Sequence, residues 1–241
     1  MKFKSERVAT GHIETAIHEF RHNVTDSTVS LVGMVHAAKP SYYESVGRYV
    51  EARESDGSIV HFEASFLPDD EQLASYPDWV GNNAKRLDKA LHTFMDCSDE
   101  DDVVPQYDTP SFTIKDSWEI HDLNTADAVM ALGMIRTWVA VKTLERFVAI
   151  GEGTKKERPL LDAASDLLLL KVTDRVIIDK RNDIALQGVE GALHANPDQD
   201  ITLLWGSFHL PGLAKGILKM DYAHTDTFWQ QAVAVEDGFK F

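Results

Sequence analysis

The sequence predicts an α/β fold in which a central mixed or mostly parallel sheet is flanked by helices, with a largely helical insertion in the middle of the chain. Helical and strand-like patterns alternate along the 241 residues, which is typical of a sheet with crossover helices. A short element also occurs twice: Gly33-Met34-Val35-His36 and Gly206-Ser207-Phe208-His209 each follow an apolar run. Glycine at the carboxyl end of a strand permits a tight turn or close contact with a ligand, so we expect each histidine at the rim of the sheet.

The first part of the chain predicts a strand, helix, strand unit. Residues 11–22 have the pattern of a short helix, and a strand then ends at Gly33. Pro40 and Ser41 open the next helix, in which Ser41 and Glu44 have the spacing of a capping box. Residues 58–63 indicate a second strand, and a parallel crossover is the expected connection between the two strands.

The middle of the chain predicts a helical cap. Residues 68–116 have a weaker pattern, with an acidic run at 99–102 that is typical of a solvated loop. A long amphipathic helix is expected over residues 124–148, ended by the glycines at 151 and 153. We therefore interpret residues 1–241 as a single domain in which residues 68–150 form a helical cap or insertion.

The last third of the chain has the clearest pattern. Residues 160–172 and 181–193 predict helices, and Asn196-Pro197 interrupts the chain before the strand of the second Gly-x-x-His element. Pro211 stands near the start of the following helix, where proline is tolerated. Residues 227–235 indicate a closing strand.

Composition limits the class of partner. A formal net charge of −15 argues against electrostatic binding to nucleic acid or to an anionic membrane. The single Cys97 fits a reducing compartment, and residues 1–23 lack the apolar stretch of a signal peptide. Charged residues interrupt the most apolar helical stretch, 126–150, so it predicts no membrane span. We expect a cytoplasmic monomer or homodimer that acts on a peptide or a small molecule.

Five side chains are candidates for chemistry. His36 and His209 would each precede a helix, whose partial positive charge keeps an imidazole neutral and able to bind a metal or to accept a proton. Glu63 ends the neighbouring strand at the same expected edge of the sheet, where a carboxylate could balance a metal or polarise a water molecule. Arg181 and Asn182 would open a helix and could stabilise an oxyanion.

These elements resemble the superfamily that groups TraB and PrgY, the TIKI proteases, GumN, the haem-binding ChaN proteins and the erythromycin esterases. The resemblance covers roughly residues 28–66 and 160–235. It rests on the two Gly-x-x-His elements, on Glu63 in Val60-His61-Phe62-Glu63, on Arg181-Asn182-Asp183-Ile184-Ala185, and on the sequel Leu210-Pro211-Gly212-Leu213. Residues 121–127, His-Asp-Leu-Asn-Thr-Ala-Asp, are similar to a divergent form of the aspartate-containing segment of TraB-like proteins.

The resemblance implies a hydrolytic site. His36, Glu63 and His209 would form the metal or catalytic centre, with Arg181 and Asn182 supporting it. TIKI-like members imply a metal-dependent protease, in which manganese, cobalt or zinc would activate the water, whereas the esterase branch implies histidine and glutamate without a metal. Lys180 stands where many TraB-like members have a glutamate, and Trp205 crowds the second motif, so both routes stay open.

A rival motif is His18-Glu19-Phe20-Arg21-His22, which matches the H-E-x-x-H signature of zinc proteases. The charge of Arg21 inside the spacer, the short segment before it and the lack of a third-ligand motif favour a solvated amphipathic helix instead. The leading hypothesis is a metal-dependent, peptidase-like or a metal-free, esterase-like hydrolase acting through His36, Glu63 and His209. The alternative is a non-catalytic protein that sequesters haem or a peptide.

Overall fold

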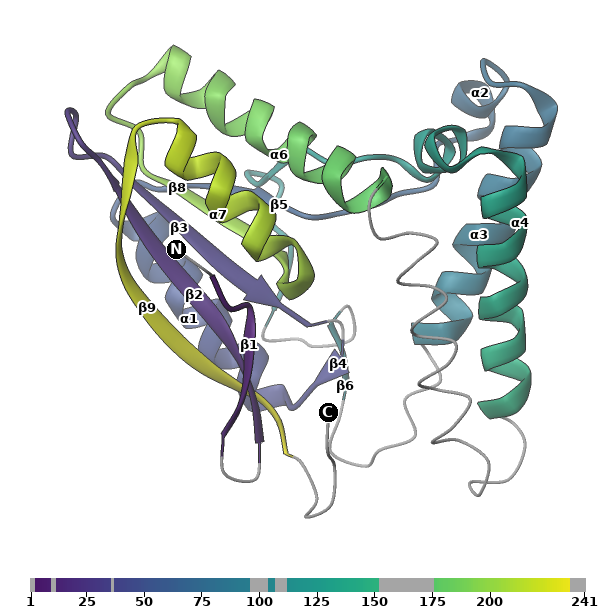
Figure 1. Cartoon of the computed structure of the whole chain (residues 1–241), viewed down its shortest axis with the longest axis horizontal. Helices are drawn as coiled ribbons and strands as arrows, with labels where there is room; N and C mark the ends of the chain where they lie inside the picture. Colours follow the sequence, from purple (N-terminus) through teal and green to yellow (C-terminus); the bar gives the residue numbers. More distant parts are fainter. Residues whose placement is uncertain are drawn as a thin grey trace. The chain divides into compact units, whose positions relative to one another are not determined.

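The structure, a computed structural model, describes residues 3–9, 12–35, 37–95, 104–106, 112–151 and 176–234, and it has the predicted α/β architecture. The chain divides into two compact units, and most of their elements are labelled in Figure 1. The first unit, residues 1–63, 98–121 and 182–241, contains the sheet. The second unit, residues 64–97 and 122–181, contains the helices of the predicted insertion.

A seven-stranded mixed sheet forms the centre of the first unit. Its parallel half has the spatial order β3, β8, β5, β7, and its antiparallel half is organised around β2. Along one edge of β2 runs β9, while β1 and β3 pair with successive halves of the opposite edge. The strands are β1 (Glu6–Ala9), β2 (His12–His22), β3 (Thr28–Met34), β5 (Ile59–Phe62), β7 (Glu119–Ile120), β8 (Ile201–Gly206) and β9 (Tyr222–Ala234). Two short strands, β4 (Ala37–Ala38) and β6 (Val104–Pro105), pair separately.

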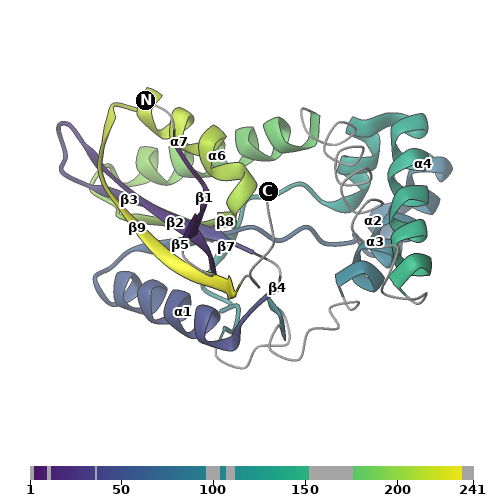
Figure 2. The same ribbon diagram turned by 60° about the horizontal axis from the view of Figure 1, so that its bottom comes forward.

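Helices cover both faces of this sheet, as Figure 2 shows. One face carries α1 (Pro40–Ser55), which connects β3 to β5, and the other carries α7 (Leu210–Lys219) and α6 (Val176–Ala195). All six residues of β8 are buried, as expected for a parallel strand that is covered on both sides. The core on the α6 and α7 face includes Phe20, Leu31, Val189, Leu203, Trp205, Leu213 and Ile217.

The predicted strand, helix, strand unit is present as β3, α1 and β5, and both strands run parallel to β8, which lies between them. The predicted capping box at Ser41 and Glu44 is wrong. The residue before α1 is Lys39, whose side chain makes no cap hydrogen bond, and Pro40 occupies the first turn. Proline fits there because the first amides of a helix have no partner within the helix.

The helix predicted over residues 11–22 is also wrong, because this segment is the strand β2. Ile13, Ile17 and Phe20 have helical spacing, which explains the misleading pattern. The burial of four consecutive residues, Thr15 to His18, arises because both faces of β2 are covered, so the alternation typical of a strand with one face in solvent is missing.

The other predicted elements of the last third are confirmed where the structure describes them. Residues 181–193 lie within α6, Asn196-Pro197 follows its end, and residues 227–234 lie in β9. Pro211 lies in the first turn of α7. The expected helix over 160–172, the acidic loop at 99–102 and the glycine at 153 lie outside the described residues.

The second unit is built from α2 (Asp70–Leu73), α3 (Asp78–Met95) and α4 (Thr125–Gly151). The long helix predicted over residues 124–148 is present but interrupted at Gly133, whose φ of 74° and ψ of 166° are not helical. Both segments of α4 pack on α3 in one apolar cluster, with Ala126 and Val129 from the first and Val141 and Leu144 from the second. Among the described helices, none has the length and apolarity required to cross a bilayer.

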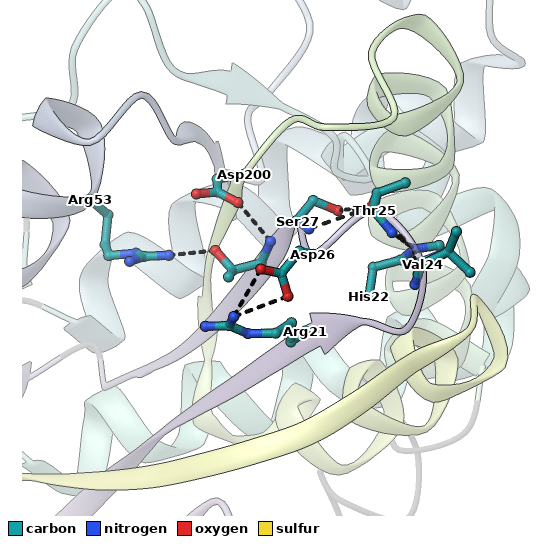
Figure 3. Close-up of polar contacts among 9 residues, drawn as sticks. Arg21, His22, Val24, Thr25, Asp26, Ser27, Arg53 and Asp200 are labelled. Carbon is teal, nitrogen blue, oxygen red and sulfur yellow. Dashed lines mark hydrogen bonds and ion pairs between the residues drawn. The ribbon is translucent and has the colours of Figure 1, made fainter.

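Polar contacts hold the amino-terminal ends of β3 and β8 in register (Figure 3). The amide of Thr28, the first residue of β3, donates to Asp200 Oδ1 at 2.6 Å, one residue before β8. Arg53, in the last turn of α1, donates to the Thr28 hydroxyl. Arg21, near the end of β2, pairs with Asp26 in the turn before β3, and Asp26 has a φ of 68°. These contacts fix three segments that are distant in the sequence against one another.

His18 generates a prediction about stability. Its Nε2 donates to the carbonyl oxygen of Lys4 at 2.9 Å, so Nδ1 accepts from the Thr227 hydroxyl at 2.9 Å. Burial lowers the pKa of His18 below its usual 6.5. The unfolded chain therefore binds more protons, and the stabilising contribution is complete above pH 6.5 and is lost as the pH falls below it.

We expect the free energy of unfolding, measured in urea between about pH 8 and about pH 5, to depend less on pH in His18→Gln than in the wild type. His92→Gln, at an exposed histidine, is the control and should retain the wild-type dependence. Identical pH dependence in His18→Gln and the wild type would contradict this account of His18.

Candidate functional site

The carboxyl ends of three parallel strands bring two of the predicted site residues together. Met34 at the end of β3 pairs with Gly206 at the end of β8, and the amide of Glu63, directly after β5, donates to Leu204 O at 3.0 Å. His209 follows β8 through the single turn η2 (Ser207–His209) and immediately precedes α7. Glu63 and His209 thus both lie at the carboxyl end of the parallel strands, as the sequence predicted.

The Glu63 carboxylate lies between the end of β8 and the His209 ring. Its Oε2 accepts a hydrogen bond from the Gly206 amide, and its Oε1 lies 3.7 Å from His209 Nε2. The exposed fractions of the two side chains are 9% and 6%. A Cβ atom on residue 206 would lie 2.9 Å from Glu63 Oε2, so glycine at this position is what lets the carboxylate reach the backbone.

Asn182 holds the other side of the His209 ring. Its Oδ1 lies 2.8 Å from His209 Nδ1, and an amide oxygen can only accept, so Nδ1 carries the proton. In a neutral ring the lone pair then lies on Nε2, which faces Glu63. A Cβ on Gly212 would collide with Asn182 Nδ2, so this glycine of the Leu-Pro-Gly-Leu sequel makes room for the amide.

Asn182, His209 and Glu63 therefore form a connected, nearly buried polar chain. The chain runs from α6 through the start of α7 to the end of β5. Its last two members present an imidazole nitrogen and a carboxylate oxygen to each other. Those two atoms can share a proton, a water molecule or a cation.

The structure corrects the placement of Arg181 and Asn182. They do not open a helix, because α6 begins at Val176 and both lie inside it. The Arg181 guanidinium binds Asp122 in a bidentate manner, with Nε to Oδ1 at 2.8 Å and Nη2 to Oδ2 at 2.7 Å. The Asp122 side chain is fully buried in this pair. His36, the remaining predicted site residue, lies outside the described residues.

The H-E-x-x-H segment is not a zinc-protease helix, and it is not the solvated amphipathic helix that we favoured. It lies on β2, where His18 is bound by Lys4 and Thr227. Glu19 accepts from the Tyr49 hydroxyl at 2.9 Å, and His22 Nδ1 accepts from the Thr25 amide at 3.1 Å. The three polar side chains of the motif thus bind other parts of the fold.

A different group of side chains could hold a metal ion: His61, Glu119 and His121. Each offers one ligand atom, and the three atoms lie within 4.8 Å of one another. His61 pairs with Glu119 in the parallel ladder between β5 and β7, and His121 directly follows β7, two residues after Glu119. Burial lowers the pKa of His61 to about 4, with the nearby His121 adding to the effect, so its ring is neutral at neutral pH.

Sequence reasoning missed this group because β7 has only two residues and its pairing with β5 leaves no periodic signal. The Glu-x-His spacing of residues 119 and 121 matches one face of a strand and was the available clue. His61 and Phe62 alternate along β5 and face opposite sides of it, since His61 packs on His121 while Phe62 packs on Phe112 and Trp118.

Comparison of the chain with protein-family models, with curated proteins and with solved structures finds no match. The function of this chain is therefore inferred from its residues and their geometry.

The Arg181–Asp122 pair generates a prediction about stability. Arg181→Met would leave the fully buried Asp122 carboxylate without its guanidinium, so we expect a loss of about 3–5 kcal/mol in unfolding free energy. Arg181→Met combined with Asp122→Leu should recover most of that loss, because the buried charge is then removed. Arg86→Met, at an exposed pair with Glu145, is the control and should change stability little. A double variant as unstable as Arg181→Met would refute the charge-burial explanation.

Proposed function

We propose that this protein is a hydrolase of the TraB and TIKI type that cleaves an amide or ester bond with a water molecule activated between Glu63 and His209. The observation that carries the proposal is the 3.7 Å separation of Glu63 Oε1 and His209 Nε2, with the His209 ring held from its far side by Asn182. A water molecule within hydrogen-bond distance of both atoms can donate to each, since both are acceptors in the neutral ring.

The proposed reaction assigns one role to each side chain. Glu63 accepts a proton as the water oxygen, oriented by a second hydrogen bond to His209, attacks the carbonyl carbon, and that proton then passes to the leaving amine or alkoxide as the bond to it breaks. Asn182 positions the ring and fixes its tautomer, as the orienting partner does in other histidine-based sites. The Gly206 amide, which donates to Glu63 Oε2, holds the carboxylate in an acceptor orientation.

The same atoms are suitable ligands for a divalent metal. Manganese, cobalt or zinc held by Glu63 and His209, with His36 as third ligand by analogy with the TraB-like pattern, would supply a water molecule that ionises near neutral pH. The metal-free route needs Glu63, His209 and Asn182 only.

We expect Glu63→Gln to lower kcat/KM by about 10²- to 10⁴-fold, because the amide cannot accept the proton of the attacking water. The measurement uses panels of chromogenic esters and internally quenched peptides with the full chain, and the binding of the best substrate to the variant should be retained. Glu145→Gln, at an exposed carboxylate of the helical unit, is the matched control and should keep wild-type activity.

Two results would count against the proposal. One is equal turnover by Glu63→Gln and the wild type. The other is tight binding of a panel member, without turnover, by the wild type, which would favour the alternative of a protein that sequesters its ligand.

A further inference from the structure

A second candidate site lies beside β5, around His61, which precedes Glu63 by two residues. The His61 side chain is fully buried, and neither of its ring nitrogens has a hydrogen-bond partner within the described residues. A buried polar atom without a partner costs about 1–3 kcal/mol, so such a histidine in a native core needs an explanation. The neighbouring residues support one explanation, which is a bound cation.

The neighbouring ligand atoms have the spacing of a metal site. Glu119 Oε2 lies 3.5 Å from His61 Nε2 and 3.0 Å from His121 Nε2. Tetrahedral zinc, with bonds of about 2.0–2.2 Å, places its ligand atoms roughly 3.4 Å apart. The two histidine rings, whose centroids are 4.5 Å apart, can thus supply two nitrogens and Glu119 one oxygen to a single ion.

The backbone of α6 is shaped to accommodate this group. A Cβ on Gly188 would collide with the His121 ring, so glycine there allows the ring to lie against the helix. An open cavity of about 620 Å³ adjoins the group, lined by Glu119 and His121 and by Ile59, Ile184, Gly188 and Gly191. A fourth coordination position can therefore face a space large enough for water or a small ligand.

We propose that His61, Glu119 and His121 bind one Zn²⁺ ion or a chemically similar divalent cation, with an open coordination position directed to the cavity beside α6. Two imidazoles and one carboxylate are the donor set that zinc accepts at sites with an exchangeable fourth ligand. This site is separate from Glu63 and His209, and it does not depend on the hydrolase proposal.

The test is titration of the full chain with Zn²⁺ by calorimetry, together with the visible absorption of Co²⁺ as a probe of tetrahedral coordination. We expect one ion per chain at this site, and a loss of affinity of at least about 100-fold in His121→Ala, since loss of even an outer partner of a metal ligand costs about 10- to 100-fold. His121 is partly exposed, so this variant should still fold.

Two controls separate the site from other metal-binding groups. His12→Ala removes a histidine with the same two-residue spacing from a glutamate on a strand, at 3.2 Å from Glu14, and should bind the ion as the wild type does. Glu63→Gln should also retain this ion, which distinguishes the site from any metal at the proposed hydrolytic centre. Zinc binding that is absent from the wild type, unchanged in His121→Ala, or lost in Glu63→Gln alone would overturn the proposal.

A glycine pair on α6 tests the geometry independently of the ligands. Gly188→Ala should weaken zinc binding by displacing His121 while leaving the helix intact, because alanine favours a helix over glycine. Gly191→Ala, where a Cβ meets nothing within 4 Å, should bind zinc like the wild type. Equal affinities in the two variants would contradict the role assigned to Gly188.

Discussion

The register of β8 between its two parallel neighbours determines where the polar side chains of this protein meet. β8 pairs with β3 from Ile201 to Gly206 and with β5 from Ile201 to Leu204, so the three strands end at one edge of the sheet. The contact of Asp200 with Thr28 fixes the opposite ends of β3 and β8. A shift of one residue would turn every side chain of β8 to the other face and would move Gly206 away from Glu63.

Three glycines provide the space that the polar side chains need. Gly206 lets Glu63 approach the β8 backbone, Gly212 makes room for Asn182, and Gly188 accommodates the ring of His121. In each case a methyl group would collide with a side chain that carries candidate chemistry. Close packing around polar groups, rather than an unusual backbone angle, accounts for these three glycines.

The sequence predicted the α/β class because its apolar runs, glycines and prolines lie at or within one residue of real boundaries, as at Gly33, Pro40 and Pro211. It failed at β2, where Ile13, Ile17 and Phe20 have helical spacing but the pairing with β3 and β9 decides the conformation. Local pattern cannot reveal the pairing with β9, because the partners lie 200 residues apart at His22 and Tyr222 and 222 residues apart at His12 and Ala234.

The candidate site was also predictable only in part, because some of its contacts depend on partners that are distant in the sequence. Glu63 and His209 could be placed at one end of the sheet from the strand patterns alone, and Asn182 was a candidate beside Arg181, although its contact with His209 was not predicted. Arg181 could not be assigned correctly, because its partner Asp122 lies about 60 residues earlier. The His61, Glu119 and His121 group depends on a two-residue strand that leaves no pattern in the sequence.

The hydrogen bond from the Gly206 amide to Glu63 holds the proposed catalytic carboxylate at the end of β8. Its most direct test is the proton chemical shift of that amide in a chain labelled with nitrogen-15 glycine. The account predicts a strongly downfield signal, protected from exchange with solvent, that moves upfield in Glu63→Gln because a neutral amide is a weaker acceptor than a carboxylate. A Gly206 signal with an ordinary shift that does not respond to Glu63→Gln would contradict it.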